Sequence, residues 1–452
     1  MTASTIRPVG TSAFWTLQRL AQALGDGPSD FRAIAGITTD TRKVRPGECF
    51  VALVGETFDG HDYLAEAVAA GAAALVVNDA RRAARLGVPV FEVHDTLIAL
   101  GMLGRYRRLA WGRPVIAVGG SNGKTSTKEL LKAVLGSRFT VHATTGNLNN
   151  RIGVPLTLLA LDDAADVAVI EAGTNIPGEI AILRDIILPD LAVVTTVQEE
   201  HLEGLGDLAG VMAEELSLTE DVDVAVVPAS EPDVVAGASA RALRVVAAGL
   251  RGANGLHADG RGWMEMDGVR LESPLRGAHN LRNLALALAV GDEFGLTAAQ
   301  MAEGLAQLTL PPMRSAIGPL GQALLINDAY NANPGSARAA IALLADVGQG
   351  RQRVAILGTM RELGAHAPAK HLEVAEAALA AGHDLVCGIG DFAAALERIA
   401  PGDPRVLTAG DVDDLWPALQ PRLQRDAAIL LKASRGVKLE RIVPLLTHWA
   451  TG

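Results

Sequence analysis

Eight short apolar runs limit most strongly how this chain can fold. They begin at about residue 114 and alternate with Ala- and Leu-rich helical patterns. Because each run is apolar at consecutive positions, it indicates a strand that is buried on both faces of a sheet. Helices between such strands form right-handed crossovers, so we expect an α/β fold with open parallel sheets covered on both sides. The runs are PVIAVGG, DVAVIEAG, DLAVVTTV, DVAVVPA, ALLINDA, RVAILGT, LVCGIG and AILLKAS.

The runs fall into two groups of four, which predicts two sheet domains. The turn-rich segment LPPMRSAIGPLG at 310–321 lies between the groups and is typical of a domain boundary. The residues before about 100 have shorter strand patterns, such as ITTD and ECFVAL, which indicate a small α/β domain. We therefore expect three domains, at 1–98, 99–312 and 313–452, which suits a chain of 452 residues.

Charge and composition argue against several classes of protein. The formal net charge is -11 and no basic stripe stands out, so we expect no nucleic-acid partner. The N-terminus lacks a signal-peptide pattern, and no uncharged apolar run approaches the ~18 residues of a membrane span. We therefore expect a cytoplasmic protein without a membrane span. The two cysteines, Cys49 and Cys387, show no metal-binding spacing and are expected to be buried thiols.

The segment PVIAVGGSNGKTSTKELLKAVLG predicts a phosphate-binding loop between a strand and a helix. Gly120 and Gly123 permit a tight turn with inward-facing N–H groups, and the helix that follows adds the positive end of its dipole. Lys124 would reach the phosphates, and the Thr125 hydroxyl would bind magnesium. The residues expected to bind ATP here are Gly120, Ser121, Asn122, Gly123, Lys124, Thr125 and Ser126.

Val118 stands where the longer P-loop pattern has a glycine, so the match is to a shortened GxxGK[ST] form. That departure argues against a GTPase. The alternative is a glycine turn with a surface lysine, and the strand and helix on either side favour nucleotide binding.

The short loop followed by TTGNLNNRIGVPLTLL at 144–159 resembles the Mur ligase family, and the likeness covers nearly the whole chain. The resemblance implies a small N-terminal α/β domain that binds UDP, a central P-loop ATPase-like domain and a C-terminal Rossmann-like domain. It also implies a monomer that uses ATP and Mg²⁺ to join D-Ala-D-Ala to UDP-N-acetylmuramoyl tripeptide through an acyl phosphate. It assigns catalysis to Lys124, Glu171, His201 and Arg314.

The resemblance extends to GITTDTRKVRPGECFVAL at 36–53 and GETFDGHDY at 55–63, which would hold the UDP end of the sugar nucleotide. Arg42 suits a diphosphate, although an Asp/Thr turn with a solvated arginine is the alternative. The substrate-binding residues implied in this domain and in the GNLNN segment are Thr39, Asp40, Thr41, Arg42, Asn147, Asn149 and Asn150.

Two strand ends supply the expected metal ligands. Glu171 follows a strand in VIEAGTNIPGEI, and His201 in TTVQEEHLEGLG resembles the family's metal-binding histidine. The family usually has a carbamylated lysine about fourteen residues after this histidine, but Glu215 stands there. Our hypothesis is that Glu215, or its neighbour Glu214, supplies a carboxylate to the second magnesium. The alternative is that both glutamates lie on a helix surface. The expected metal ligands are thus Thr125, Glu171, His201 and Glu215.

The remaining nucleotide contacts are expected from GAHNLRNLALALAV at 277–290 and from the start of the third domain. The first segment is similar to the family's HNxxN motif, which would place Asn280 and Asn283 at the adenine ring; helix capping is the alternative. Arg314 would contact the γ-phosphate or acyl phosphate, and closure of the third domain would exclude water.

The segment LLINDAYNANPGS at 324–336 resembles the family's DSYNANP motif. By that likeness Asp328 would bind the ribose or nucleotide, while Tyr330, Asn331 and Asn333 would line the cleft for the incoming amine. Two further family segments depart from the usual pattern, because Thr359 replaces an aspartate and Ala433 a glycine.

Two alternative functions stay open at this point. One is a sibling ligase that extends a different muramoyl peptide or adds glutamates to a folate, although GNLNNRIGVP and DAYNANP favour addition of D-Ala-D-Ala. The other is a nucleotide-dependent switch or scaffold, which has no need for the first and third domains. The third residue of the acceptor peptide is not determined by the sequence.

Overall fold

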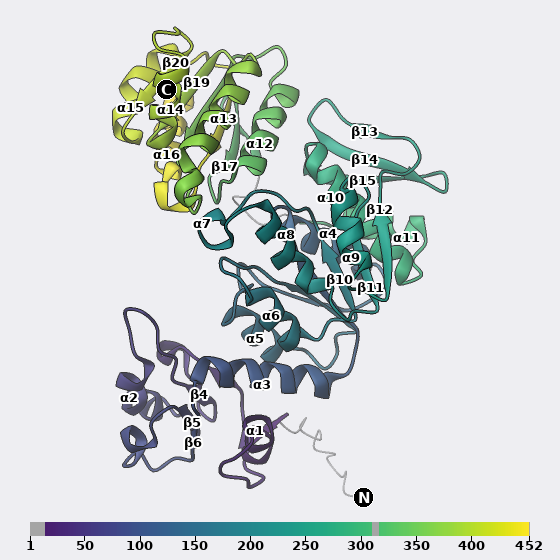
Figure 1. The fold of residues 1–452 in the computed structure, drawn as a ribbon, viewed down its shortest axis with the longest axis vertical. Coiled ribbons are helices and arrows are strands. Elements are labelled where there is room, and N and C mark those ends of the chain that lie inside the picture. Colours follow the sequence, from purple (N-terminus) through teal and green to yellow (C-terminus); the bar gives the residue numbers. More distant parts are fainter. Residues whose placement is uncertain (1–13, 310–315, 452) are drawn as a thin grey trace, which may run out of the picture. The chain divides into compact units, whose positions relative to one another are not determined.

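The computed structural model describes residues 14–309 and 316–451, and Figure 1 shows their helices and strands. Its parallel sheets with covering helices confirm the α/β fold class. The contacts between Cα atoms divide the chain into two compact units. The first takes in the chain up to Arg113 together with Thr144–Ala164 and Ile182–Leu188, and the second takes in Pro114–Ala143, Ala165–Ala181 and the chain from Pro189 onward. The expected domain limits at 98 and 312 stay predictions.

The first unit is built on a small parallel sheet with the strand order β3-β4-β5-β6. Successive residues of a strand face opposite sides, and both sides are apolar here, because Cys49 and Val51 join one buried cluster while Phe50 joins another. The strands and helices are β1 (Trp15–Thr16), β2 (Ala33–Ile34), β3 (Ile37–Thr38), β4 (Cys49–Val51), β5 (Ala74–Val77), β6 (Val90–Glu92), α1 (Leu17–Leu24), α2 (Leu64–Ala69), α3 (Thr96–Trp111) and α5 (Gly153–Leu159).

The second unit contains the central sheet, whose strands are all parallel in the order β12-β11-β10-β7-β9-β8. Four of the apolar runs form its inner strands, as predicted. The outermost strands were not predicted, since an edge strand needs no continuous apolarity and both are only partly buried. The strands are β7 (Val115–Gly119), β8 (Val141–Ala143), β9 (Val167–Glu171), β10 (Leu191–Val194), β11 (Val224–Pro228) and β12 (Arg244–Ala248).

Helices and a second sheet cover the central strands. Leu130, Leu131, Val134 and Leu135 of α4 are fully buried in one cluster with β7, β9 and α10, which confirms the apolar face expected after the glycine-rich loop. The elements are α4 (Lys124–Gly136), α6 (Glu179–Ile187), α7 (Leu202–Leu205), α8 (Leu208–Leu216), α9 (Pro232–Ser239), α10 (Ala278–Glu293), α11 (Ala298–Ala306) and the antiparallel strands β13 (Asn254–Leu256), β14 (Arg261–Met266) and β15 (Val269–Arg276).

The C-terminal sheet, drawn from green to yellow in Figure 1, has the order β16-β17-β21-β18-β19-β20. The four remaining apolar runs form its parallel strands β17, β18, β19 and β21, and β16 pairs antiparallel with β17 inside the segment expected to be a boundary. The elements are β16 (Ala316–Leu320), β17 (Ala323–Asp328), β18 (Arg353–Gly358), β19 (Leu385–Ile389), β20 (Val406–Ala409), β21 (Ala428–Lys432), α12 (Pro334–Val347), α13 (Ala367–Ala380), α14 (Asp391–Ile399), α15 (Val412–Leu419) and α16 (Ile442–Thr451).

Two expectations from composition can be compared with the structure. Cys49 and Cys387 are buried and unpaired, as expected. Among the helices of residues 14–309 and 316–451, none is both long enough and apolar enough to span a bilayer.

Candidate functional site

The phosphate loop joins the end of β7 to the start of α4. Gly120 and Gly123 have φ angles of 110° and 87°, in the region that favours glycine. A Cβ atom on Gly120 would lie 2.7 Å from the backbone nitrogen of Thr195, so the close approach to the end of β10 also requires glycine. No described side chain caps the first turn of α4. This backbone geometry is that of an anion-binding loop.

Lys124 lies folded over the loop. Its Nζ donates to the carbonyl oxygens of Gly120 at 2.5 Å and Ser121 at 3.4 Å, and it lies 3.9 Å from Oε1 of Glu200. The ammonium group is therefore held over the turn where the sequence predicts the phosphates of a nucleotide.

Thr125 and Glu171 meet at the carboxyl end of β9. The Thr125 hydroxyl donates to Oε2 of Glu171 at 2.8 Å, and both residues are buried. Hydroxyl and carboxylate oxygens are ligands that Mg²⁺ prefers. The structure thus brings two of the four predicted metal ligands into direct contact.

Glu214 and Glu215 are both buried, so neither is a surface residue of α8. The carboxylate of Glu214 accepts hydrogen bonds from the backbone nitrogens of Gly178 at 2.7 Å and Ile180 at 2.8 Å, which fixes the start of α6. Glu215 points to the phosphate loop instead, where its Oε2 accepts from the nitrogen of Gly120 at 2.6 Å. Burial raises the pKa of Glu215. The two neighbours therefore have different structural roles.

Glu200 is a site residue that the sequence reasoning missed. Its side chain is buried, its Oε1 is the atom nearest Lys124, and its Oε2 accepts a long contact of 3.5 Å from Nδ2 of Asn333. Burial raises the pKa of Glu200 to about 7, because the charge of Lys124 only partly offsets the loss of hydration and Glu215 adds a second negative charge.

Nothing in the pattern QEEH separates Glu200 from the glutamate before it. Glu199 forms an ion pair with Lys370 at 2.8 Å and is partly exposed, whereas Glu200 faces the loop. Two consecutive glutamates in a sequence give no signal of such a difference, which depends on how the chain turns after β10.

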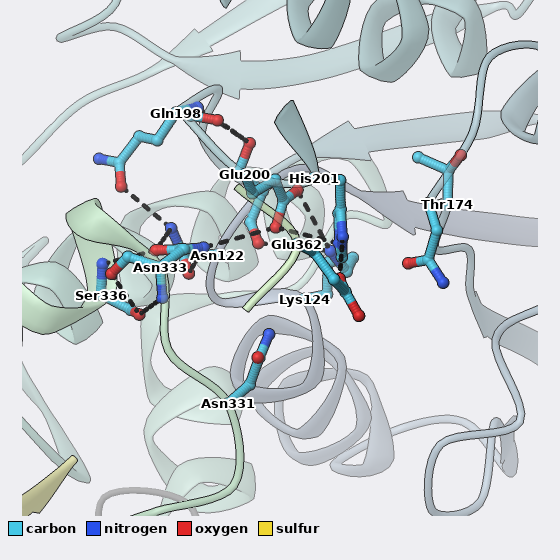
Figure 2. Close-up of polar contacts among 12 residues, drawn as sticks. Asn122, Lys124, Thr174, Gln198, Glu200, His201, Asn331, Asn333, Ser336 and Glu362 are labelled. Carbon is cyan, nitrogen blue, oxygen red and sulfur yellow. Dashed lines mark hydrogen bonds and ion pairs between the residues drawn. The ribbon is translucent and has the colours of Figure 1, made fainter. Parts of the chain in front are cut away.

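His201 has an ion pair that the sequence did not predict. Its Nδ1 lies 2.5 Å from Oε2 of Glu362, and its Nε2 lies 3.7 Å from Oε2 of Glu200. Burial by itself would lower the pKa of His201, but the carboxylates of Glu362 and Glu200 outweigh it and the pKa is raised. Figure 2 shows these three side chains grouped with Lys124. Both His201 and Glu362 have positive φ angles, of 48° and 65°.

The predicted metal ligands are not assembled as a complete coordination shell. Among the described residues, no group of three or more His, Cys, Asp or Glu side chains is arranged to hold a metal ion. The donor chemistry nevertheless fits a magnesium ion. Oε1 of Glu200 and Oε1 of Glu215 are buried oxygens that accept no hydrogen bond from the described residues, and the Thr125 hydroxyl lies against Glu171.

The asparagines expected at adenine lie at the start of α10, buried against the phosphate loop. Asn280 donates to the carbonyl oxygen of Arg276 at 2.9 Å, and Asn283 donates to Oδ1 of Asn280 at 3.0 Å. A Cβ atom on Gly123 would come within 2.7 Å of Nδ2 of Asn283. Burial lowers the pKa of the neighbouring His279 to about 4, so its imidazole is neutral at pH 7.

The C-terminal residues of the predicted site cluster at the ends of β17 and β21. Lys432, which the sequence reasoning did not single out, donates from Nζ to Asp328 at 2.6 Å and to the carbonyl oxygen of Asn331 at 2.7 Å. The guanidinium of Arg435 lies 5.4 Å from the centre of the Tyr330 ring. The end of β21 thus fixes the segment 328–331.

Asn333 links this segment to the phosphate loop. Its amide exchanges hydrogen bonds with the amide of Asn122, at 2.9 Å and 3.2 Å, and its Oδ1 caps α12 by accepting from the nitrogen of Ser336 at 2.8 Å. Figure 2 shows the amides of Asn122 and Asn333 turned toward each other. Arg314, predicted to contact a phosphate, lies outside the described residues.

The predicted uridine-end residues form a local turn in the first unit. Thr41 begins a short 3-10 helix, Thr41–Lys43, whose N-cap is Asp40. The Asp40 carboxylate accepts from the backbone nitrogen of Arg42 at 3.1 Å and from its Nε at 2.8 Å. The hydrogen bond from Arg42 lowers the pKa of Asp40 to about 2. Thr39 precedes this turn, and the Arg42 side chain is 85% exposed.

The three asparagines of the GNLNN segment also lie in the first unit. Oδ1 of Asn150 accepts from the backbone nitrogens of Ile152 at 3.1 Å and Gly153 at 2.9 Å, which caps the start of α5. The nitrogen of Asn149 donates to the carbonyl oxygen of Asn147 at 2.8 Å. Asn150 therefore has a clear structural role in addition to any role in binding.

Comparisons with known proteins agree along the whole chain. Three family models match in sequence order. Residues 33–108 match the Mur ligase family catalytic domain, residues 118–291 match the Mur ligase middle domain, and residues 315–435 match the Mur ligase glutamate ligase domain.

Several relatives match over nearly their full length. The chain is 38% identical to the UDP-N-acetylmuramoyl-tripeptide--D-alanyl-D-alanine ligase of Escherichia coli strain K12, over 92% of this chain and 94% of the relative. It is 34% identical to the enzyme of that name from Bacillus subtilis strain 168, over 91% and 92%. A MurF crystal structure from Acinetobacter baumannii aligns with a TM-score of 0.88 and 28% identity, over 96% of this chain and 99% of that one. MurF from Thermotoga maritima, solved in complex with ADP, aligns with a TM-score of 0.79 and 27% identity, over 92% and 98%.

Proposed function

This chain belongs to the Mur ligase family, and we infer that it is the ligase that joins D-alanyl-D-alanine to UDP-N-acetylmuramoyl tripeptide. The product is the UDP-muramoyl pentapeptide precursor of peptidoglycan. One structural observation carries the inference, namely the amide pair between Asn122 of the phosphate loop and Asn333 of the DAYNANP segment. A ligase needs its nucleotide and its incoming amine in one site, because the activated carboxyl group and the amine must meet in order to react.

The reaction requires activation of a carboxylate, which does not condense with an amine at neutral pH. We propose that the tripeptide carboxylate attacks the γ-phosphate of ATP, and that the amine of D-Ala-D-Ala then displaces phosphate from the acyl phosphate. Two unit negative charges 4 Å apart repel by about 4 kcal/mol at an effective dielectric of 20. Lys124, held over the loop, lowers that repulsion.

A magnesium ion bound here would supply further positive charge to the phosphates. The residues proposed to hold it are Thr125, Glu171, His201 and Glu215. Glu215 takes the position of the family's carbamylated lysine, and its burial at the nitrogen of Gly120 supports that assignment.

The remaining roles are proposals that rest on the family resemblance and on location. Asn280 and Asn283 at the phosphate loop would bind adenine, Asp328 the ribose, and Arg314 a phosphate. Tyr330, Asn331 and Asn333 would receive the dipeptide. In the first unit, the residues that would bind the UDP-sugar and its peptide are Thr39, Asp40, Thr41, Arg42, Asn147, Asn149 and Asn150. The cytoplasmic location and the monomeric state stay predictions.

The decisive experiment measures ATP-dependent phosphate release with UDP-muramoyl tripeptide, Mg²⁺ and D-Ala-D-Ala, with each component omitted in turn and the product mass determined. We expect release that depends on all components, together with a pentapeptide product. Release with a different amine or acceptor would move the chain to a sibling ligase. Release without either substrate would overturn the ligase assignment in favour of a nucleotide-dependent switch.

A further inference from the structure

Two buried carboxylate oxygens beside the phosphate loop accept no hydrogen bond from any described residue. They are Oε1 of Glu200 and Oε1 of Glu215. Glu200 is 3% exposed and Glu215 is 0% exposed, so neither carboxylate is solvated at the surface. Because an unpaired buried carboxylate is unfavourable, such oxygens usually have a cation as partner.

The protein's own cations near the loop do not balance these charges. Lys124 is shared, since its Nζ lies 3.9 Å from Oε1 of Glu200 and makes its shortest printed contact, of 2.5 Å, to the carbonyl oxygen of Gly120. The nitrogen of that glycine donates to Oε2 of Glu215 at 2.6 Å, so one loop residue connects the surroundings of both carboxylates. Glu171 is a third buried carboxylate beside the loop. One lysine therefore faces several buried acids, before an anionic nucleotide binds.

We propose that Glu200 is a cation ligand of this site and that it shares one divalent cation with Glu215. The proposal rests on the proposed function for the presence of a magnesium nucleotide, and it adds a ligand that neither the motifs nor the family resemblance supplied. Carboxylate oxygens are the donors that Mg²⁺ and Mn²⁺ prefer. Two glutamates on separate segments, one after β10 and one in α8, would together bring two carboxylates to the loop from opposite ends of a 15-residue stretch of chain, since 215 − 200 = 15.

The competing explanation is that Glu200 only neutralises Lys124. An ion pair of 3.9 Å is at the outer limit for such a contact, and Lys124 has closer partners in the loop. The two explanations differ in what removal of the charge does. A simple ion-pair partner affects stability but leaves cation binding unchanged, whereas a ligand affects cation binding directly.

The test titrates Mn²⁺ into the full-length protein in the presence of ADP, with free Mn²⁺ followed by electron paramagnetic resonance. Glu200→Gln keeps the shape of the side chain and removes its charge. We expect its Kd for Mn²⁺ to rise at least tenfold, while the matched control Glu199→Gln, one residue away and paired with Lys370, changes less than threefold. A Kd for Glu200→Gln within threefold of the unaltered protein overturns the proposal.

A double-mutant cycle with Glu215→Gln tests whether one cation is shared. If both carboxylates bind the same ion, the combined loss in the double variant is smaller than the product of the two single losses. Losses that multiply independently overturn the shared site. If Glu200→Gln fails to fold in thermal melts, Glu200→Asp replaces it, because it keeps the charge but withdraws it by one methylene; a proposed ligand then still gives a weaker Kd, and an unchanged Kd overturns the proposal.

This titration involves no ligase turnover, so its failure and that of the proposed function can be told apart. Phosphate release by the unaltered protein tests the function. The Mn²⁺ titration tests only the place of Glu200 in the site.

Discussion

The phosphate loop and the turn at 39–42 are both predicted ligand sites, but they are built in opposite ways. The loop is held by distant segments, since Gly120 contacts Glu215 and Ser121 contacts Gln198. In the turn, the side-chain contacts of Asp40 are with Arg42 and Lys43, two and three residues away. Aspartate followed two residues later by a paired arginine recurs elsewhere in the chain, at Asp30 and Arg32, Asp79 and Arg81, Asp259 and Arg261, and Asp403 and Arg405.

The difference shows what geometry can indicate about function. A site assembled from distant segments is specific, because each contact restricts the position of the others. A turn made by neighbouring residues recurs wherever its short pattern occurs, so its geometry does not distinguish a ligand site from a surface turn. Only the family resemblance separates the turn at 39–42 from the other four.

The largest effect is expected for Gly120→Ala, which would break the loop. The new methyl group would meet Thr195 at a φ of 110°, so we expect a loss of about 2 to 4 kcal/mol in stability and at least a hundredfold weaker binding of ADP. Gly136→Ala is the matched control, because its Cβ meets nothing within 4 Å at the end of α4. Thermal melts and ADP titration measure both variants, and normal ADP binding by Gly120→Ala would contradict the rigid-loop description.

The next effect separates two adjacent glutamates of α8. Glu215→Gln removes the charge at the loop, and we expect phosphate release to fall about a hundredfold with a higher requirement for Mg²⁺. Glu214→Gln weakens the bonds to Gly178 and Ile180, so it should lower stability by about 1 kcal/mol with a much smaller change in rate. An unchanged rate and Mg²⁺ requirement in Glu215→Gln would rule out its role at the second magnesium.

A smaller, pH-dependent effect is expected for Glu362→Gln. The pKa of His201 is raised above its ordinary value of 6.5, and the pKa of Glu362 is lowered below 4.5 by its contact with His201. The ion pair therefore stabilises the fold fully between about pH 4.5 and 6.5. The stabilisation is lost as pH rises through the raised pKa of His201 or falls through the lowered pKa of Glu362.

Because the Glu362 side chain is 54% exposed, the stabilisation should not exceed about 1 kcal/mol. Urea unfolding in EDTA at pH 5.5 and pH 9 measures it as the difference between the protein and Glu362→Gln. A difference that is larger at pH 9 than at pH 5.5 would show that the ion pair does not form.

The smallest effect on stability is expected for Arg42→Ala, which sharpens the comparison from the other side. Its exposed pair with Asp40 should contribute less than about 0.5 kcal/mol. Arg81→Ala removes the same kind of pair with Asp79, from a side chain that is 91% exposed, and serves as the matched control. If the turn at 39–42 binds the sugar nucleotide, Arg42→Ala raises the KM for UDP-muramoyl tripeptide about tenfold while Arg81→Ala leaves it unchanged. Equal KM values for both variants would remove Arg42 from the binding site.

Much of the fold could be predicted because its inner strands are apolar on both faces. All eight apolar runs form strands, and the loop between β7 and α4 lies where GGSNGKTST predicts it. The edge strands β8 and β12 and the sheet of β13, β14 and β15 were missed, since partly exposed strands carry weaker patterns. Thr359, which replaces the family's aspartate, has a visible local role, because its hydroxyl oxygen accepts from the nitrogen of Asp391 at the start of α14.

The sequence by itself determined the α/β class, the phosphate loop and the family, because these depend on local patterns of apolar residues, glycines and short motifs. The tertiary structure alone decided which of two adjacent glutamates faces the loop, both at 199–200 and at 214–215. It also decided that Lys432 meets Asp328 and that His201 meets Glu362. The physical reason is that neighbouring side chains in a sequence point in different directions, and only the packing of distant segments determines which direction is buried, charged and close to the site.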